Sequence, residues 1–200
     1  MIYQSISDIY AANDTVRRQL AARVENLGEA QRTFRPGADA WSIAEIVDHL
    51  SKIEQQMVQL IGMLLRKCEG AAVASSAVTA SDEREAAAER APGFQPFSLD
   101  AFVEQVRDEK LTAPEQVRPS GNVPLAEALA NLRRTRAAIE DLRPRLEATD
   151  LSAATFPHPF FGEFNAAQWL AFIGIHEGRH LRQIENLLAA PGFDKSEASS

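Results

Sequence analysis

The chain has little cysteine, no long apolar run and a deficit of positive charge. Cys68 is the only cysteine, so no disulfide can form within the chain. No apolar run reaches the roughly 18 residues that span a bilayer, and the N-terminus lacks the basic and apolar regions of a signal peptide. A net charge of −7 gives no electrostatic reason to bind nucleic acid or an anionic membrane. These absences predict a cytoplasmic protein with neither a nucleic-acid nor a membrane partner.

Helical periodicity is present in four segments. Apolar residues recur at spacings of three, four and seven, the pattern of helices that bury one face. The segments cover residues 7–27, 42–64, 124–146 and 165–187. Ser42 and Glu45 form a capping box at the start of the second segment. Pro144, inside the third, is expected to kink or shorten the end of its helix.

The stretch between the second and third helices, residues 70–111, has no clear pattern. Residues 81–90 and 98–111 each suit a short helix, and no convincing strand is visible anywhere in the chain. A connection of this length is expected when the two helices that it joins run parallel. The sequence therefore predicts an all-α four-helix bundle with a long crossover between helices two and three. It forms a single domain over residues 1–190, followed by a polar tail over 191–200.

Three of the four histidines, His49, His176 and His180, fall on the apolar faces of the second and fourth helices. His176 and His180 are four residues apart, so they lie one above the other on a helix. A single histidine on an apolar face is usually a hydrogen-bonded core residue. Three such rings are harder to satisfy, because each unpaired buried group costs about 1–3 kcal/mol. A shared divalent metal would bind one nitrogen of each ring and keep an open position, as in catalytic zinc sites, and nickel, iron, cobalt or copper would also suit.

The same run matches H-E-x-x-H, the motif of zinc metalloprotease helices. This match is weak because it fixes three positions only, no histidine follows His180, and no sheet is predicted beside the helix. Glu185 is the one candidate for a third protease ligand. The protease hypothesis is therefore disfavoured, although Glu177 remains a candidate general base. The alternative for Glu177 is a solvated helix residue.

Other polar residues near the histidines have two interpretations each. His158, between two prolines, is a candidate proton carrier or fourth ligand, but packing on nearby aromatic rings is favoured. Gln183, three residues after His180, is expected to support that ring through a hydrogen bond. Arg179 is a candidate site for an anionic substrate, or an ordinary surface arginine. Cys68 is expected to be buried or inert, because nothing near it in sequence would lower the pKa of its thiol.

Three stretches of the sequence resemble a known family. The run W-S-I-A-E-I-V-D-H-L at residues 41–50 is similar to the second-helix motif of the DinB-like (DinB/YfiT-like) metalloenzyme superfamily. H-P-F-F-G at 158–162 and H-x-x-R-H-L-R-Q-I at 176–184 resemble the approach to its last helix and that helix itself. The resemblance covers roughly residues 5–190. It implies a four-helix bundle, often a homodimer, in which His49, His176 and His180 bind a divalent metal such as zinc, nickel or iron.

The resemblance also implies a set of reactions. Characterised relatives include S-transferases and isomerases that use low-molecular-weight thiols such as mycothiol or bacillithiol, and others are called metal-dependent hydrolases. The leading hypothesis is a thiol-dependent S-transferase acting on a small electrophilic molecule, in which the metal lowers the pKa of the thiol. One alternative is a metal-dependent hydrolase of a small amide or ester. Another is a non-enzymatic metal-binding stress or sensor protein, which a fully protein-ligated metal would favour.

Overall fold

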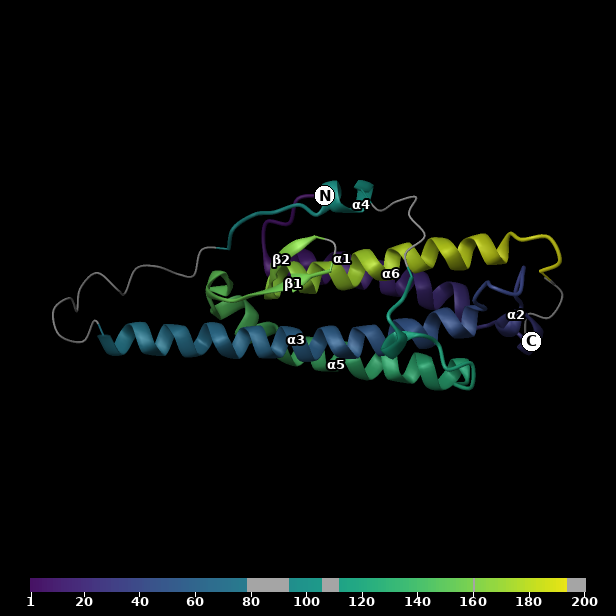
Figure 1. The fold of residues 1–200 in the computed structure, drawn as a ribbon, viewed down its shortest axis with the longest axis horizontal. Coiled ribbons are helices and arrows are strands. Elements are labelled where there is room, and N and C mark those ends of the chain that lie inside the picture. Colours follow the sequence, from purple (N-terminus) through teal and green to yellow (C-terminus); the bar gives the residue numbers. More distant parts are fainter. Residues whose placement is uncertain (79–93, 106–111, 160, 194–200) are drawn as a thin grey trace.

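Four long helices lie side by side and form the body of the protein (Figure 1). The computed structural model describes residues 1–78, 94–105, 112–159 and 161–193. The long helices are α1 (Ile6–Val24), α3 (Ile43–Val78), α5 (Leu125–Ala148) and α6 (Ala166–Leu188). A short helix, α2 (Glu29–Thr33), lies between α1 and α3. The four-helix bundle predicted from the sequence is confirmed.

The long helices run in two directions. Figure 1 shows α1 and α6 running one way along the bundle, and α3 and α5 running the other way. Because α3 and α5 are parallel, the chain must return along the bundle between them, which explains the long crossover. The described part of the crossover contains α4 (Asp100–Gln105) and a 3-10 turn, η3 (Glu115–Val117). The helix predicted over 98–111 is described only as α4, and the one predicted over 81–90 lies outside the described residues.

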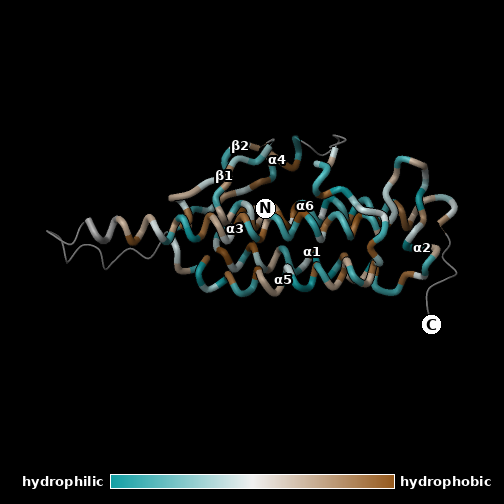
Figure 2. Tube along the Cα trace, turned by 60° about the horizontal axis from the view of Figure 1, so that its bottom comes forward, coloured by the Kyte–Doolittle hydropathy of each residue, from teal (hydrophilic) through white to brown (hydrophobic). Residues whose placement is uncertain are grey.

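The core fills the space between the long helices in two clusters of buried apolar side chains. One surrounds Tyr10, Ile61 and Leu170, and the other surrounds Leu20, Val47 and Ile184. The apolar positions alternate with polar ones along each long helix (Figure 2), so the predicted stripes form the interior. Burying one such leucine or isoleucine contributes about 1.5–3 kcal/mol. The two clusters together hold the histidine-bearing helices α3 and α6 against each other.

The expectation that the chain contains no strand is wrong. A hairpin precedes α6, in which β1 (Thr155–His158) pairs antiparallel with β2 (Gly162–Asn165). Each strand has four residues, which is too short to show a clear alternation in the sequence. Gly162 begins the second strand with a φ of 78°, a left-handed conformation that glycine adopts without strain. A further 3-10 turn, η4 (Leu151–Ala153), leads into this hairpin.

Two predicted helix ends also differ from the structure. The helix α3 continues to Val78, well past the last apolar position of its pattern at Leu64. Its final turns are rich in alanine, which has the highest helix propensity but leaves no apolar period to read. Pro144 does not shorten α5, which continues for one turn to Ala148. No helix among the described residues is both long enough and apolar enough to cross a membrane.

Candidate metal centre

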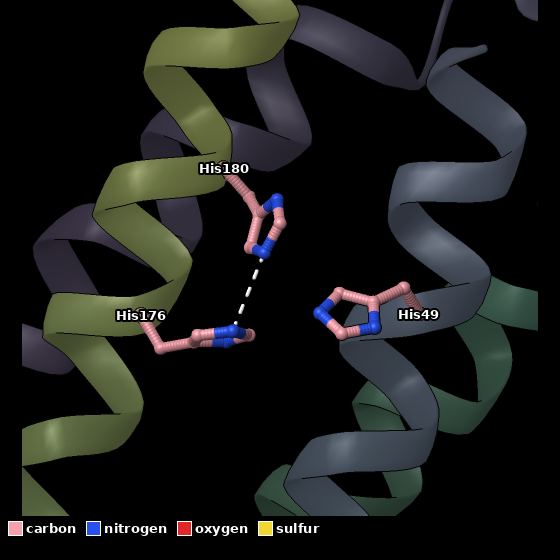
Figure 3. Close-up of side chains that lie close together, drawn as sticks. All are labelled: His49, His176 and His180. Carbon is pink, nitrogen blue, oxygen red and sulfur yellow. Dashed lines mark hydrogen bonds between the residues drawn. The ribbon is translucent and has the colours of Figure 1, made fainter. Parts of the chain in front are cut away.

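Three histidines from two helices converge inside the bundle. His49 of α3 points toward His176 and His180 of α6 in the space between these helices (Figure 3). One nitrogen from each ring can be chosen so that all three lie within 4.8 Å of one another. The Nε2 atoms of His176 and His180 are 3.3 Å apart. Two nitrogens that bind one tetrahedral zinc at about 2.1 Å lie about 3.4 Å apart, so this pair already has a suitable separation.

Hydrogen bonds fix the orientation of two of the rings. The Nδ1 atom of His49 lies 2.7 Å from the backbone carbonyl of Val117 in η3. A carbonyl can only accept, so Nδ1 carries the proton and Nε2 keeps its lone pair. The Nδ1 atom of His180 lies 2.7 Å from Oε1 of Gln183, which has the same consequence. The expected hydrogen bond between His180 and Gln183 is therefore present, and both rings turn an unprotonated Nε2 toward the centre of the cluster. There Nε2 of His180 accepts a hydrogen bond from Nε2 of His176.

The environment keeps all three rings neutral. Burial is the largest cause in each case: it lowers the pKa of His49, lowers that of His176 well below 6.5, and lowers that of His180 to about 3. The neighbouring rings lower the pKa values of His176 and His180 further. Metal ions bind the neutral imidazole, so at neutral pH none of the rings has to lose the extra proton of an imidazolium before binding.

Trp41 forms one wall of the cluster. Its ring centroid lies 5.0 Å from that of His49 and 6.5 Å from that of His180, to which it is nearly parallel. It immediately precedes the capping box, in which the Ser42 amide donates to Glu45 at 2.9 Å and the Glu45 amide donates to Ser42 at 3.3 Å. In the sequence, Trp41 is recognisable only as part of the family motif. Its contact with both ligand helices could be found only once the fold was known.

Glu177 does not join the histidines. Its side chain is 1% exposed and pairs with Arg17 of α1, which also pairs with Glu54 of α3. The alternative interpretation of Glu177 as a solvated helix residue is therefore wrong. Burial, followed by the charge of Glu54, raises the pKa of the Glu177 carboxyl to about 7, although Arg17 opposes this change. The hydroxyl of Thr135 donates to Glu54 and completes a buried cluster, the Arg17 network of Arg17, Glu54, Thr135 and Glu177.

His158 packs among aromatic rings, as favoured from the sequence. Burial lowers its pKa to about 4. It lies outside the group of possible metal ligands found among the described residues. The ring centroid of Phe172, one of the neighbours of His158, lies 6.1 Å from that of His176. The rings around His158 are those of Phe161, Phe164, Trp169 and Phe172, with centroids 4.4–5.5 Å away.

Arg179 acts on the histidine cluster through its charge, whereas Cys68 is a buried residue. Arg179 is half-buried, and its positive charge contributes to the lowered pKa of both His176 and His180. It therefore lies close enough to act electrostatically on any group bound there. Cys68 is 2% exposed, and burial raises the pKa of its thiol, so it is buried as expected.

The fold and the site together make this protein a helical bundle with a candidate metal centre. Its three histidines converge from the second and fourth long helices. The model of the DinB superfamily matches residues 12–184, and the chain belongs to this superfamily. The chain is 28% identical over 169 residues to the uncharacterized protein YuaE of Bacillus subtilis (strain 168), covering 82% of this chain and 87% of that protein. The crystal structure of TT2238, a four-helix bundle protein, shares the fold with a TM-score of 0.54. That match has 19% identity and covers 90% of this chain and 98% of the other.

Proposed function

We propose that the protein is a cytoplasmic, metal-dependent enzyme that catalyses thiol-dependent S-transfer to a small electrophile. The observation that carries this proposal is the convergence of three neutral imidazoles from α3 and α6, with one nitrogen from each within 4.8 Å of the others. The chain belongs to the DinB superfamily, and its resemblance to members that use low-molecular-weight thiols supports the reaction class. The same resemblance supports a small-molecule substrate and a homodimer.

The donor set fits a divalent cation. His49 and His180 donate their Nδ1 protons to Val117 and Gln183, so their Nε2 lone pairs face the cluster. Such outer hydrogen bonds are typical of metal-binding histidines, because they set the tautomer and make the ligand more basic. When bound, zinc, nickel or iron would supply a Lewis acid that lowers the pKa of a thiol or of water.

The number of ligands supports an enzyme. Among the described residues, the candidate group contains three histidines and no cysteine, aspartate or glutamate. Structural zinc sites are closed by four protein ligands, whereas catalytic sites have three and keep a position for water or substrate. A closed metal-binding stress or sensor protein would need a fourth ligand.

Side chains around the centre suit a small anionic ligand. Trp41 provides an aromatic surface beside the rings of His49 and His180. Arg179 places a positive charge near His176 and His180, which would attract a carboxylate on a thiol or substrate. Gln183 holds the ring of His180, and His158 supports Phe172 beside His176.

The first test of this proposal is metal binding. Protein purified without added metal should contain, or take up, one divalent ion per chain when it is titrated with Zn²⁺, Ni²⁺ or Fe²⁺ in a calorimeter. His49→Ala should weaken binding by at least about 10-fold, because it removes one of three ligands. His158→Phe is the matched control, because it removes a histidine but keeps an aromatic ring in the cluster around position 158. A wild-type chain that binds no divalent ion would overturn the proposal.

The second test separates the reaction classes. Protein loaded with Co²⁺ or Ni²⁺ should change its metal absorbance when cysteine, mycothiol or bacillithiol is added, and His49→Ala should abolish the change. Metal binding with no response to any of the three thiols would contradict S-transfer and favour hydrolysis of a small ester or amide. Light scattering would check the proposed homodimer.

A further inference from the structure

The crossover between α3 and α5 reaches the candidate metal centre through one backbone carbonyl. Val117, in η3, is buried and accepts a hydrogen bond from His49 at 2.7 Å, across 68 residues of sequence. Because the carbonyl can only accept, this contact decides which nitrogen of His49 carries the proton. The tautomer of a ligand on α3 therefore depends on the position of a segment that is remote in sequence.

Asp48 holds that segment in place. Its side chain is 4% exposed, and Oδ2 accepts from the backbone amide of Ser120 at 2.9 Å and from the Ser120 hydroxyl at 3.2 Å. Lys52, one turn later on α3, donates to Asp48 at 2.9 Å and to the Arg118 carbonyl at 3.0 Å. We refer to residues 112–121 as the strap. Through these contacts Asp48 and Lys52 of α3 anchor the strap just after Val117, whose carbonyl binds His49.

The burial of Asp48 argues that this arrangement is specific. A buried carboxylate is costly unless it is paired and hydrogen-bonded. Lys52 of the same helix pairs with Asp48, but the hydrogen bonds from Ser120 form only when the strap is docked. Asp48 is not in the candidate ligand group among the described residues, although it is the sequence neighbour of His49. Its oxygen atom Oδ2 is already engaged by Ser120 and Lys52.

We propose that Asp48 is a positioning residue of the metal centre: it anchors the strap so that the Val117 carbonyl holds His49 with Nε2 toward the metal. The effect of Asp48 on metal affinity rests on the proposed function. Its effect on the tautomer of His49 applies to the metal-free protein as well. By linkage, metal binding and docking of the strap stabilise each other.

The opposite end of α3 supplies a matched control. Asp150 accepts a hydrogen bond from the backbone amide of Ser152 at 2.9 Å and so caps η4, another short turn packed on α3. This turn lies beside Cys68, which is 19 residues after His49 and so about 28 Å away along the helix. Asp150→Asn therefore also removes a carboxylate that bonds a turn packed on α3, at an exposed position far from the histidines.

The test compares Asp48→Asn with Asp150→Asn in the full chain. Asp48→Asn should raise the Kd for Zn²⁺ by about 10-fold or more, the usual cost of losing an outer partner of a metal ligand. Asp150→Asn should leave the Kd within about twofold of wild type. Lys52→Met, at a partly exposed helix position, should give a smaller loss of about threefold. Hydrogen exchange should show that Zn²⁺ protects the strap in wild type but not in Asp48→Asn.

Nitrogen NMR of the histidines gives a readout that needs no metal. In metal-free wild type, His49 should carry its proton on Nδ1, and in Asp48→Asn it should become a mixture of both tautomers. If wild type binds no Zn²⁺ but the tautomer still shifts only in Asp48→Asn, the positioning role stands and the proposed metal function fails. An unchanged tautomer and Kd in Asp48→Asn would overturn the inference, and so would an equal loss of affinity in Asp150→Asn.

Discussion

Two polar clusters flank the same two turns of α6, and they are balanced in different ways. The Arg17 network joins Glu177 and Glu54 through one guanidinium, which also donates to the carbonyl of Leu132. The histidine cluster contains no opposite charge: three neutral rings face one another, and two of them turn an unprotonated Nε2 toward the others. The charges of the Arg17 network are paired within the protein, whereas the histidine cluster has acceptor nitrogens directed at a common point.

The difference shows how neighbouring residues acquire separate roles. His176 and Glu177 are adjacent in sequence but point to different neighbours, because successive residues on a helix are about 100° apart. His176 meets His49 and His180, and Glu177 meets Arg17. The H-E-x-x-H motif is thereby divided between the two clusters. The glutamate of the motif pairs with an arginine, and its histidines contact each other. This arrangement argues against a protease more strongly than the weakness of the sequence match does.

The largest effect is expected from breaking the Arg17 network. Arg17→Met would leave two buried carboxylates facing each other, so the free energy of unfolding should fall by about 3–5 kcal/mol in urea titrations. Arg145→Met, which breaks the exposed pair with Glu69, is the control and should change stability little. The folded fraction of Arg17→Met should still bind Zn²⁺. An unchanged stability would mean that the network does not hold α1 on the bundle.

Adding metal should stabilise the histidine cluster alone. At a free Zn²⁺ concentration 100 times the Kd, wild type should gain about 2.7 kcal/mol of unfolding free energy. His176→Ala should gain almost none, because it removes a ligand, while a chelator should return wild type to its metal-free stability. Thermal unfolding with and without Zn²⁺ measures both. An equal gain in wild type and His176→Ala would place the stabilising metal elsewhere.

The two clusters were not equally predictable from the sequence. The apolar periods of α3 and α6 put His49, His176 and His180 on inward faces, so their convergence followed from a parallel-crossover bundle. Gln183 followed too, because a residue three positions after His180 lies on the same helix face. Local periodicity is sufficient when a site is built from long, regular helices.

The Arg17 network and the strap could not be predicted in this way. Arg17 and Glu177 are 160 residues apart, and Val117 is 68 residues from His49. A backbone carbonyl gives no signal in sequence at all, since every residue has one. Charged residues such as Arg17 and Glu54 are normally solvated. The sequence therefore predicts that their side chains are exposed until the partner that compensates for their burial is known. The hairpin could not be predicted because each of its strands has four residues, too few to show a clear alternation.

A close approach of α1 to α6 supports only one of the two clusters. A Cβ added at Gly174 would clash with Oδ1 of the buried Asn13, whose Nδ2 donates to the Leu170 carbonyl. Gly174→Ala should therefore push α1 outward and cost about 1–3 kcal/mol of unfolding free energy, as overpacking does. The Kd for Zn²⁺ should stay within about twofold, because the histidines lie between α6 and α3. Calorimetry and urea titration together separate the two effects.

Gly178→Ala is the matched control for this substitution. Its added Cβ would meet only Val16, at an ordinary distance of 3.9 Å. Because alanine has the higher helix propensity by about 1 kcal/mol, this variant should be as stable as wild type or more so. Equal destabilisation by both alanines would show that the approach of the helices at Gly174 is not what limits the substitution.

The smallest expected effect is a difference in pH dependence. Burial lowers the pKa of His180 to about 3 from an ordinary value of 6.5. Between these values the unfolded chain binds a proton that the folded chain does not, so this ring makes stability fall as the pH decreases below 6.5. In metal-free protein, His180→Gln should remove about 1 kcal/mol of the loss between pH 6.5 and 5.5. Urea titrations of wild type and variant at both pH values measure it.

Glu177 should act with the opposite sign. Burial raises the pKa of its carboxyl to about 7 from 4.5, so the folded chain holds a proton that the unfolded chain has lost in this window. The contribution is complete below about pH 4.5 and disappears as the pH rises through 7. Glu177→Gln should therefore make stability fall more steeply with acid, whereas His180→Gln makes it fall less. Parallel pH profiles for the two variants would contradict the distinction between a cluster that excludes protons and a network that retains one.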